Sequence, residues 1–285
     1  MKLAKLSLAA IVVAGLTTSS FAADSLEGAF KEGKVSGELK AYYFTKDNGT
    51  TDADIFTSGL TLGYKTGSLY GFSLGLTAQA SASPFADVDG KNMFEGSMYG
   101  PGAVLSEVYV AYNLKNTTVM VGRMFLDTPL VASSGSRIVR DAFEGAAVIN
   151  TDLPNTTLIA GYVQKHQDRT SGTDWAIGEF SRTFALGSIA ATPELKDGGY
   201  TLAAINKSVA GLTLTAAYAD AVDIVKIAYL EGLYEGKAGE IGYNLAGQYY
   251  YNKFDNGVED TINVYALKAG VSFKGINAYA AYTDV

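Results

Sequence analysis

The stretch GLTLGYKTGSLYGFSLGLTAQASAS, residues 59–83, alternates large apolar residues with small or polar ones. Phe72, Leu74 and Leu76 share one parity, and glycine, serine and threonine occupy the positions between and after them. Strict period two indicates a β-strand, because successive side chains of a strand point to opposite faces of the sheet. The pattern also runs on past the five or six residues of an ordinary soluble strand.

The same alternation recurs along the chain and predicts about thirteen or fourteen strands. Many of them are nine to eleven residues long, the length that a tilted strand needs to cross a bilayer. Short and long connections roughly alternate between them, and all five prolines fall in connections. The predicted strands are 35–44, 56–64, 72–81, 104–114, 117–126, 142–150, 156–166, 176–184, 199–207, 211–219, 223–234, 241–251, 265–273 and 275–283.

The polar face of these strands distinguishes between two all-β architectures. It consists mainly of serine, threonine, glycine, glutamine and asparagine, and charged residues make up only 18% of the chain, compared with roughly 25% in ordinary globular proteins. Aromatic residues gather near predicted strand ends, such as YYF at 42–44 and YYY at 249–251. These features favour a transmembrane antiparallel β-barrel with lipid outside and a polar interior. A soluble exported β-sandwich is the alternative.

The N-terminus predicts export. Lys2 and Lys5 precede an apolar stretch at 6–16, and Ser20-Phe21-Ala22 forms a cleavage site of small residues. This is the pattern of a secretory signal peptide. We therefore expect a signal peptide at 1–22 and a mature β-barrel domain at 23–285.

Several kinds of chemistry are disfavoured. The net charge of −7 and the lack of a basic patch argue against nucleic acid as a partner. With no cysteine and one histidine, His166, the chain offers no ordinary zinc site. His166, Asp168 and Ser171 lack a nucleophile elbow, so we expect no enzyme activity. The acidic stretches 46–54, with Asp47, Asp52 and Asp54, and 87–92 lack the spacing of a calcium loop, so we expect neither metal nor cofactor.

Three segments resemble OprD-type bacterial outer-membrane porins. They are LEGAFKEGKVSGELKAYYF (26–44), LGYKTGSLYGFSLG (62–75) and VGRMFLDTPLVASSGSRIVRDAFEGA (121–146). The order and spacing of these motifs carry the resemblance, which covers most of the mature chain. It implies an 18-stranded barrel in the outer membrane of a Gram-negative bacterium. Its partners would be outer-membrane lipid, permeant small solutes and the barrel assembly machinery, and it would be a monomer or a trimer.

The resemblance also implies a function and candidate residues. The barrel would be a water-filled channel for passive diffusion of small solutes such as amino acids or other carboxylates. The segment from Asp127 to Asp141 would be a loop that folds inward and constricts the pore. Arginine keeps its charge and forks onto carboxylates, and charged rings set pore selectivity. The constriction candidates are Arg123, Arg137, Arg140 and Asp127, with Lys40, Lys65 and Lys165 as further pore-lining candidates.

Two alternatives remain open at the level of the sequence. The chain ends AYAAYTDV, without the terminal aromatic residue expected of this family. Together with the strand count, this predicts a chain truncated at its C-terminus. A complete barrel of 12 or 14 strands from another porin-like family is the other interpretation. An outer-membrane adhesin or structural barrel without an open pore is the alternative function.

Overall fold

The computed structural model describes residues 23–169, 177–183, 194–255 and 261–285. The predicted signal peptide, residues 1–22, lies outside the described residues. Within them, no helix has the length and apolar character needed to span a membrane.

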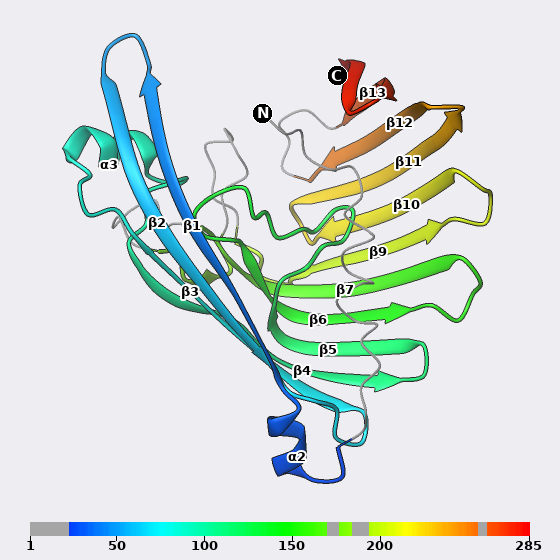
Figure 1. Cartoon of the computed structure of the whole chain (residues 1–285), viewed down its shortest axis with the longest axis horizontal. Coiled ribbons are helices and arrows are strands. Elements are labelled where there is room, and N and C mark those ends of the chain that lie inside the picture. Colours follow the sequence, from blue (N-terminus) through cyan, green and yellow to red (C-terminus); the bar gives the residue numbers. More distant parts are fainter. Residues whose placement is uncertain (1–22, 170–176, 184–193, 256–260) are drawn as a thin grey trace.

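One antiparallel sheet of 14 strands makes up most of the described chain and curves around a concave side (Figure 1). All strands except β8 follow one another across the sheet in chain order. Within the described sheet, β1 pairs only with β2, and β14 pairs only with β13. The strands are β1 (Lys34–Asp47), β2 (Asp52–Lys65), β3 (Phe72–Ala82), β4 (Gly102–Leu114), β5 (Thr117–Met124), β6 (Ala142–Asn150), β7 (Thr156–Gln167), β8 (Phe180–Ser181), β9 (Gly199–Asn206), β10 (Leu212–Ala221), β11 (Val225–Ala238), β12 (Ile241–Phe254), β13 (Ile262–Phe273) and β14 (Ile276–Asp284).

The alternation predicted most of these strands to within a few residues at their ends, with one larger exception. The strand predicted over 176–184 is wrong in extent: only the two-residue β8 forms in the described part of it, and it lies off the main path. The reason is competition for one edge. β9 pairs with β7 along Thr156–Val163, which leaves only the last four residues of β7, and of these His166 and Gln167 pair with β8.

Burial on β3 is inverted relative to a soluble protein. Phe72, Leu74 and Leu76 are 53%, 41% and 43% exposed on the convex side. Ser73 and Thr77, which alternate with them, are only 4% and 7% exposed. Burying polar side chains while exposing leucines would be unfavourable in water, but it suits a wall with hydrocarbon outside. The fold is therefore the predicted transmembrane β-barrel type.

Two short helices lie in connections where no helix was predicted. α2 (Leu26–Lys31) precedes β1, and α3 (Val88–Phe94) lies between β3 and β4. Each begins at a polar cap: Ser25 and Asp87 accept hydrogen bonds from backbone N–H groups three residues on, at 3.0 and 2.7 Å. Asp87 of the acidic stretch 87–92 thus caps a helix. Nowhere in the described residues do three or more acidic or histidine side chains cluster as metal ligands would.

Candidate functional site

The connection between β5 and β6, residues 125–141, folds onto the concave side of the sheet (Figure 1). We call it the inner loop. Its Ile138 is buried in a cluster with Ile55 of β2, whereas its Leu130 packs against the cluster that contains Tyr229 of β11. Because β2 and β11 are far apart in the sheet, the inner loop bridges distant parts of the wall. The predicted inward fold of this segment is therefore observed, whereas its role in constricting a pore stays a prediction.

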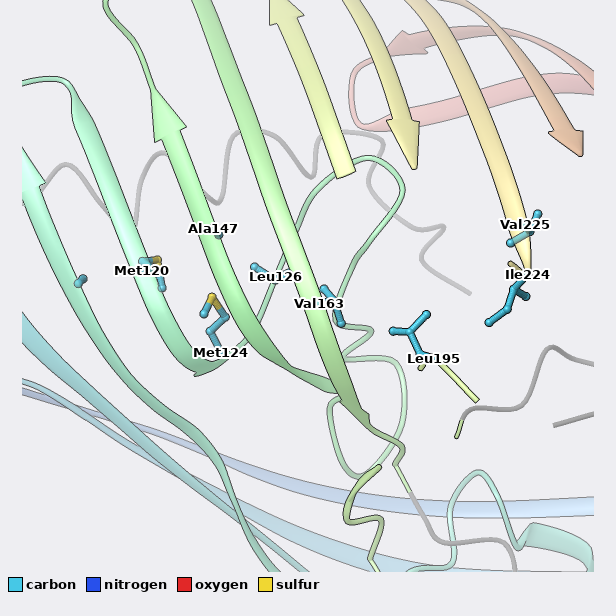
Figure 2. Packing of buried hydrophobic residues seen from close by; sticks show 9 residues of the cluster. Met120, Met124, Leu126, Ala147, Val163, Leu195, Ile224 and Val225 are labelled. Atoms are coloured by element: carbon cyan, nitrogen blue, oxygen red, sulfur yellow. The ribbon is translucent and has the colours of Figure 1, made fainter. Parts of the chain in front are cut away.

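The start of the inner loop is held by apolar packing. Figure 2 shows Leu126 among side chains from strands β5, β6 and β7, with Met124 and Val163 nearby. The same buried cluster includes Leu195, which precedes β9, and Ile224, which precedes β11. The interior near the inner loop therefore contains apolar residues as well as polar ones.

Two predicted constriction residues pair with each other. Arg140 Nη2 donates hydrogen bonds to both carboxylate oxygens of Asp127, each at 2.8 Å. The Arg140 guanidinium also stacks over the ring of Phe125, 4.4 Å from its centroid. A cation held in this way on two sides ties the two ends of the inner loop together. Arg140 and Asp127 thus form a structural clamp.

Arg137 is in a different situation. Its guanidinium donates one hydrogen bond, from Nη1 to the carbonyl oxygen of Ser136 at 3.4 Å. Among the described residues, no carboxylate forms an ion pair with it. Lys40 of β1 lies beside it, since Lys40 Nζ is 3.4 Å from the Arg137 carbonyl oxygen. The Lys40 side chain is only 7% exposed, and Nζ is 3.5 Å from Glu38.

Arg123, Glu144 and Lys165 form a row across β5, β6 and β7, where the register places them opposite one another. Glu144 accepts from Arg123 Nε at 3.0 Å and from Lys165 Nζ at 2.8 Å. Arg123 also lies over the ring of Phe180, 4.3 Å from its centroid. The structure therefore assigns Glu144 as the partner of two predicted cations.

The parity of Arg123, which it shares with exposed Val121, is explained by irregular backbone. Gly122 has a φ of +128°, outside ordinary strand geometry, and the β6–β7 register shifts between Glu144 and Gly145. Such irregularities re-aim side chains next to them.

Lys65, the last residue of β2, shares parity with buried Thr57 and so lies on the inner face. Lys65 is ten residues along β2 from Ile55, and Ile55 packs in the buried cluster that contains Ile138 of the inner loop. At about 3.3 Å per residue, this separation is about 30 Å. Lys65 therefore belongs to the opposite end of the wall, away from the inner loop.

Two residues that position the inner loop were not singled out from the sequence. Gln79 of β3 binds the backbone of Arg140 through both ends of its side-chain amide. Gly59 of β2 faces Ile138, and a Cβ at Gly59 would be 2.8 Å from the Ile138 side chain. In the sequence, Gln79 is visible only as a long amide side chain and Gly59 only as a glycine, both on the predicted inner face. Neither residue type identifies its partner.

The residues weighed as a catalytic group lie beside the end of β7. His166 Nδ1 is 3.3 Å from Asp168, and Arg169 is 3.1 Å from Asp141. Burial raises the pKa of Asp168, and the neighbouring His166 partly opposes this shift. Ser171, the third member considered, lies outside the described residues.

Comparisons with known proteins agree with this geometry. A family model described as outer membrane porin, OprD family, matches residues 27–285. No curated protein matches the chain.

Three solved structures are similar in fold. OccK8 (OprE) of Pseudomonas aeruginosa has a TM-score of 0.75 at 18% identity, covering 90% of this chain and 68% of that one. OccAB1 of Acinetobacter baumannii has a TM-score of 0.74 at 17% identity, covering 93% and 68%. A BenF-like porin from Pseudomonas fluorescens Pf-5 has a TM-score of 0.75 at 16% identity, covering 90% and 68%. The chain thus spans about two thirds of the length of these structures.

Proposed function

Because the chain belongs to the OprD family of outer-membrane porins, we propose that it favours small carboxylate-bearing solutes and that Arg137, whose backbone carbonyl Lys40 binds, attracts them to the inner loop. Transport through a porin is passive, so the protein contributes an open path and a bias toward some solutes over others. The bias comes from charges that line the narrowest part of the path.

The observation that carries this proposal is the contrast between paired and available cations. Arg140 is bound to Asp127, and Arg123 and Lys165 share Glu144. An ion pair has little attraction left for a passing anion. Arg137, by contrast, has only a carbonyl oxygen as hydrogen-bond partner among the described residues. Its remaining N–H groups can fork onto a carboxylate.

The chemistry also suits passage rather than tight binding. Arg137 is partly exposed on the inner loop, so water screens its charge. A solute carboxylate would exchange water for the guanidinium and then leave down its gradient. Conduction requires attraction that is strong enough to favour entry and weak enough to permit exit.

Ion selectivity in planar bilayers tests this proposal. In a KCl gradient, Arg137→Ala should move the reversal potential toward cation preference. In vesicles, it should slow the uptake of a small carboxylate more than that of a neutral solute of equal size. Lys207→Ala, in the short β9–β10 connection, is the matched control. Unchanged selectivity of Arg137→Ala would remove Arg137 from this role.

A barrel without an open pore is the second candidate function. The inner loop and three buried apolar clusters occupy parts of the concave side, which favours this alternative. Such a barrel would act as an adhesin or a structural protein. Single-channel recordings separate the two, because a barrel with a filled interior produces no current steps.

A further inference from the structure

Gln79 binds the inner loop through both ends of its side-chain amide. It lies on the inner face of β3 and is 2% exposed. Its Oε1 accepts from the Arg140 backbone N–H at 2.9 Å, and its Nε2 donates to the Arg140 carbonyl at 2.8 Å. The two bonds resemble one step of a β-ladder, made between a side chain and a loop.

A second amide extends this contact across the interior. Gln79 Nε2 also donates to Ser106 Oγ at 2.7 Å, and Ser106 Oγ donates to Gln167 Oε1 at 2.7 Å. Gln167 Nε2 donates in turn to the carbonyl oxygen of Asp168 at 3.1 Å. Ser106 and Gln167 are fully buried. We call this series of contacts, from the Arg140 backbone through Gln79 and Ser106 to Gln167, the relay. Each of its donor atoms has at least one acceptor, so the network favours one arrangement of β3, β4 and β7.

A β-bulge makes the relay possible. In the β3–β4 ladder, Thr77 pairs with Glu107 and Ala78 pairs with Leu105, so Ser106 is the extra residue. A bulged residue is left out of the regular pairing and its side chain is re-aimed. Here the bulge places the Ser106 hydroxyl between the two amides.

The relay differs from the clamp in its charge. The Arg140–Asp127 pair is ionic and its side chains are partly exposed, so salt screens it. The Gln79 contacts are neutral and buried, so neither salt nor ordinary pH changes them. Arg140 joins both: its side chain belongs to the clamp and its backbone to the relay.

We propose that Gln79 is a positioning residue that fixes the inner loop against the wall and so sets the width of the pore. The proposal rests on the channel function above, and it adds a residue that need not touch the solute. Without Gln79, the inner loop would keep the Arg140–Asp127 ion pair but lose the hydrogen bonds that fix its position against β3.

The substitution Gln79→Glu tests this role, because it keeps the shape of the side chain and, when ionised, replaces the two N–H donors with a charged acceptor. An ionised carboxylate accepts from the Arg140 N–H but cannot donate to the Arg140 carbonyl or to Ser106. At pH 8 we expect open-channel current noise several-fold above wild type. At pH 4, near the ordinary pKa of about 4.3 for a glutamate, protonation returns one donor and the noise should fall toward wild type.

Two further variants separate positioning from general damage. Gln79→Leu has no donor at any pH, so its noise should stay high at both values. Ser73→Ala lies on the same strand and face, and its hydroxyl has no hydrogen-bond partner among the described residues. It should behave as wild type.

A measurement that does not depend on channel current distinguishes a failure of the Gln79 proposal from a failure of the proposed channel function. Trypsin cleavage after Arg137, measured at pH 8, should be several-fold faster in Gln79→Glu and Gln79→Leu than in Ser73→Ala. If wild type never conducts, the channel function fails, and cleavage alone decides the role of Gln79. Wild-type cleavage rates in both Gln79 variants would overturn the role of Gln79, as would equal noise of Gln79→Glu at both pH values.

Discussion

Gly122 has a backbone conformation that other residues adopt only with strain, and it stands directly before Arg123. Its φ is +128°, and a Cβ added there would lie 2.2 Å from the carbonyl oxygen of Val108. At this position the backbones of β5 and β4 lie too close together to leave room for a Cβ. The charge of Arg123 then meets Glu144.

Gly122→Ala should therefore destabilise the protein. The backbone conformation alone costs about 1–3 kcal/mol for a residue with a Cβ, and the overlap with Val108 adds to it. Thermal unfolding in detergent, followed by circular dichroism, measures the loss. Gly135→Ala in the inner loop is the control, because nothing lies within 4 Å of its added Cβ. Equal unfolding temperatures for both variants would contradict this account.

The inner loop is attached by ionic, hydrogen-bonded and apolar contacts. Its ends are joined by the Arg140–Asp127 clamp, its backbone is bound to Gln79, and Ile138 packs against Gly59. Loops that lie inside a barrel are ordered only if such contacts offset their conformational entropy. The apolar contacts resist salt, whereas the clamp does not.

Asp127→Asn should loosen the inner loop without displacing it. The substitution keeps the shape but removes one charge, leaving the Arg140 guanidinium without its counter-ion at a cost of about 1–3 kcal/mol. Hydrogen exchange followed by mass spectrometry should show faster exchange across 126–140 in low salt. Asp152→Asn, in the β6–β7 turn, is the control. Exchange that stays at the wild-type rate would mean that the clamp contributes little.

The outer face of the sheet is mainly apolar, whereas the inner face combines small and polar side chains with the apolar clusters near the inner loop. Leu76 is exposed on the outer face, whereas Thr61 of the neighbouring β2 lies on the inner face opposite Glu38. This partition determines where a charge is tolerated. On the lipid side a lysine has no partner, and on the inner side it has water and Glu38.

Leu76→Lys and Thr61→Lys should thus differ in stability. A lysine facing lipid costs about 2–4 kcal/mol at the bilayer midplane and less near its surfaces. Urea unfolding from lipid vesicles should show a lower free energy of unfolding for Leu76→Lys than for Thr61→Lys. The reverse order would contradict the assignment of the two faces.

Much of the fold could be predicted from the sequence, because period two is a local property of each strand. The predicted strand at 72–81 is observed as β3, Phe72–Ala82. The prediction failed where another segment competed for the backbone. The strand predicted to reach residue 126 ends at Met124, since the Phe125 N–H donates to the Glu107 carboxylate at 3.0 Å. Likewise, β9 pairs with the edge of β7 to which a longer β8 would have to pair.

The residues alone determined the positions of most strands and the face that meets lipid, since both follow from neighbours one or two positions away. They did not determine which cations stay available, because a charge is neutralised by partners that are distant in the chain. Arg140 meets Asp127 within the inner loop, but Lys40 reaches Arg137 across 97 positions and Gln79 reaches Arg140 across 61. Only folding brings such groups to hydrogen-bond distance. Of the two arginines of the inner loop, it paired Arg140 with Asp127 and left Arg137 without a counter-ion among the described residues.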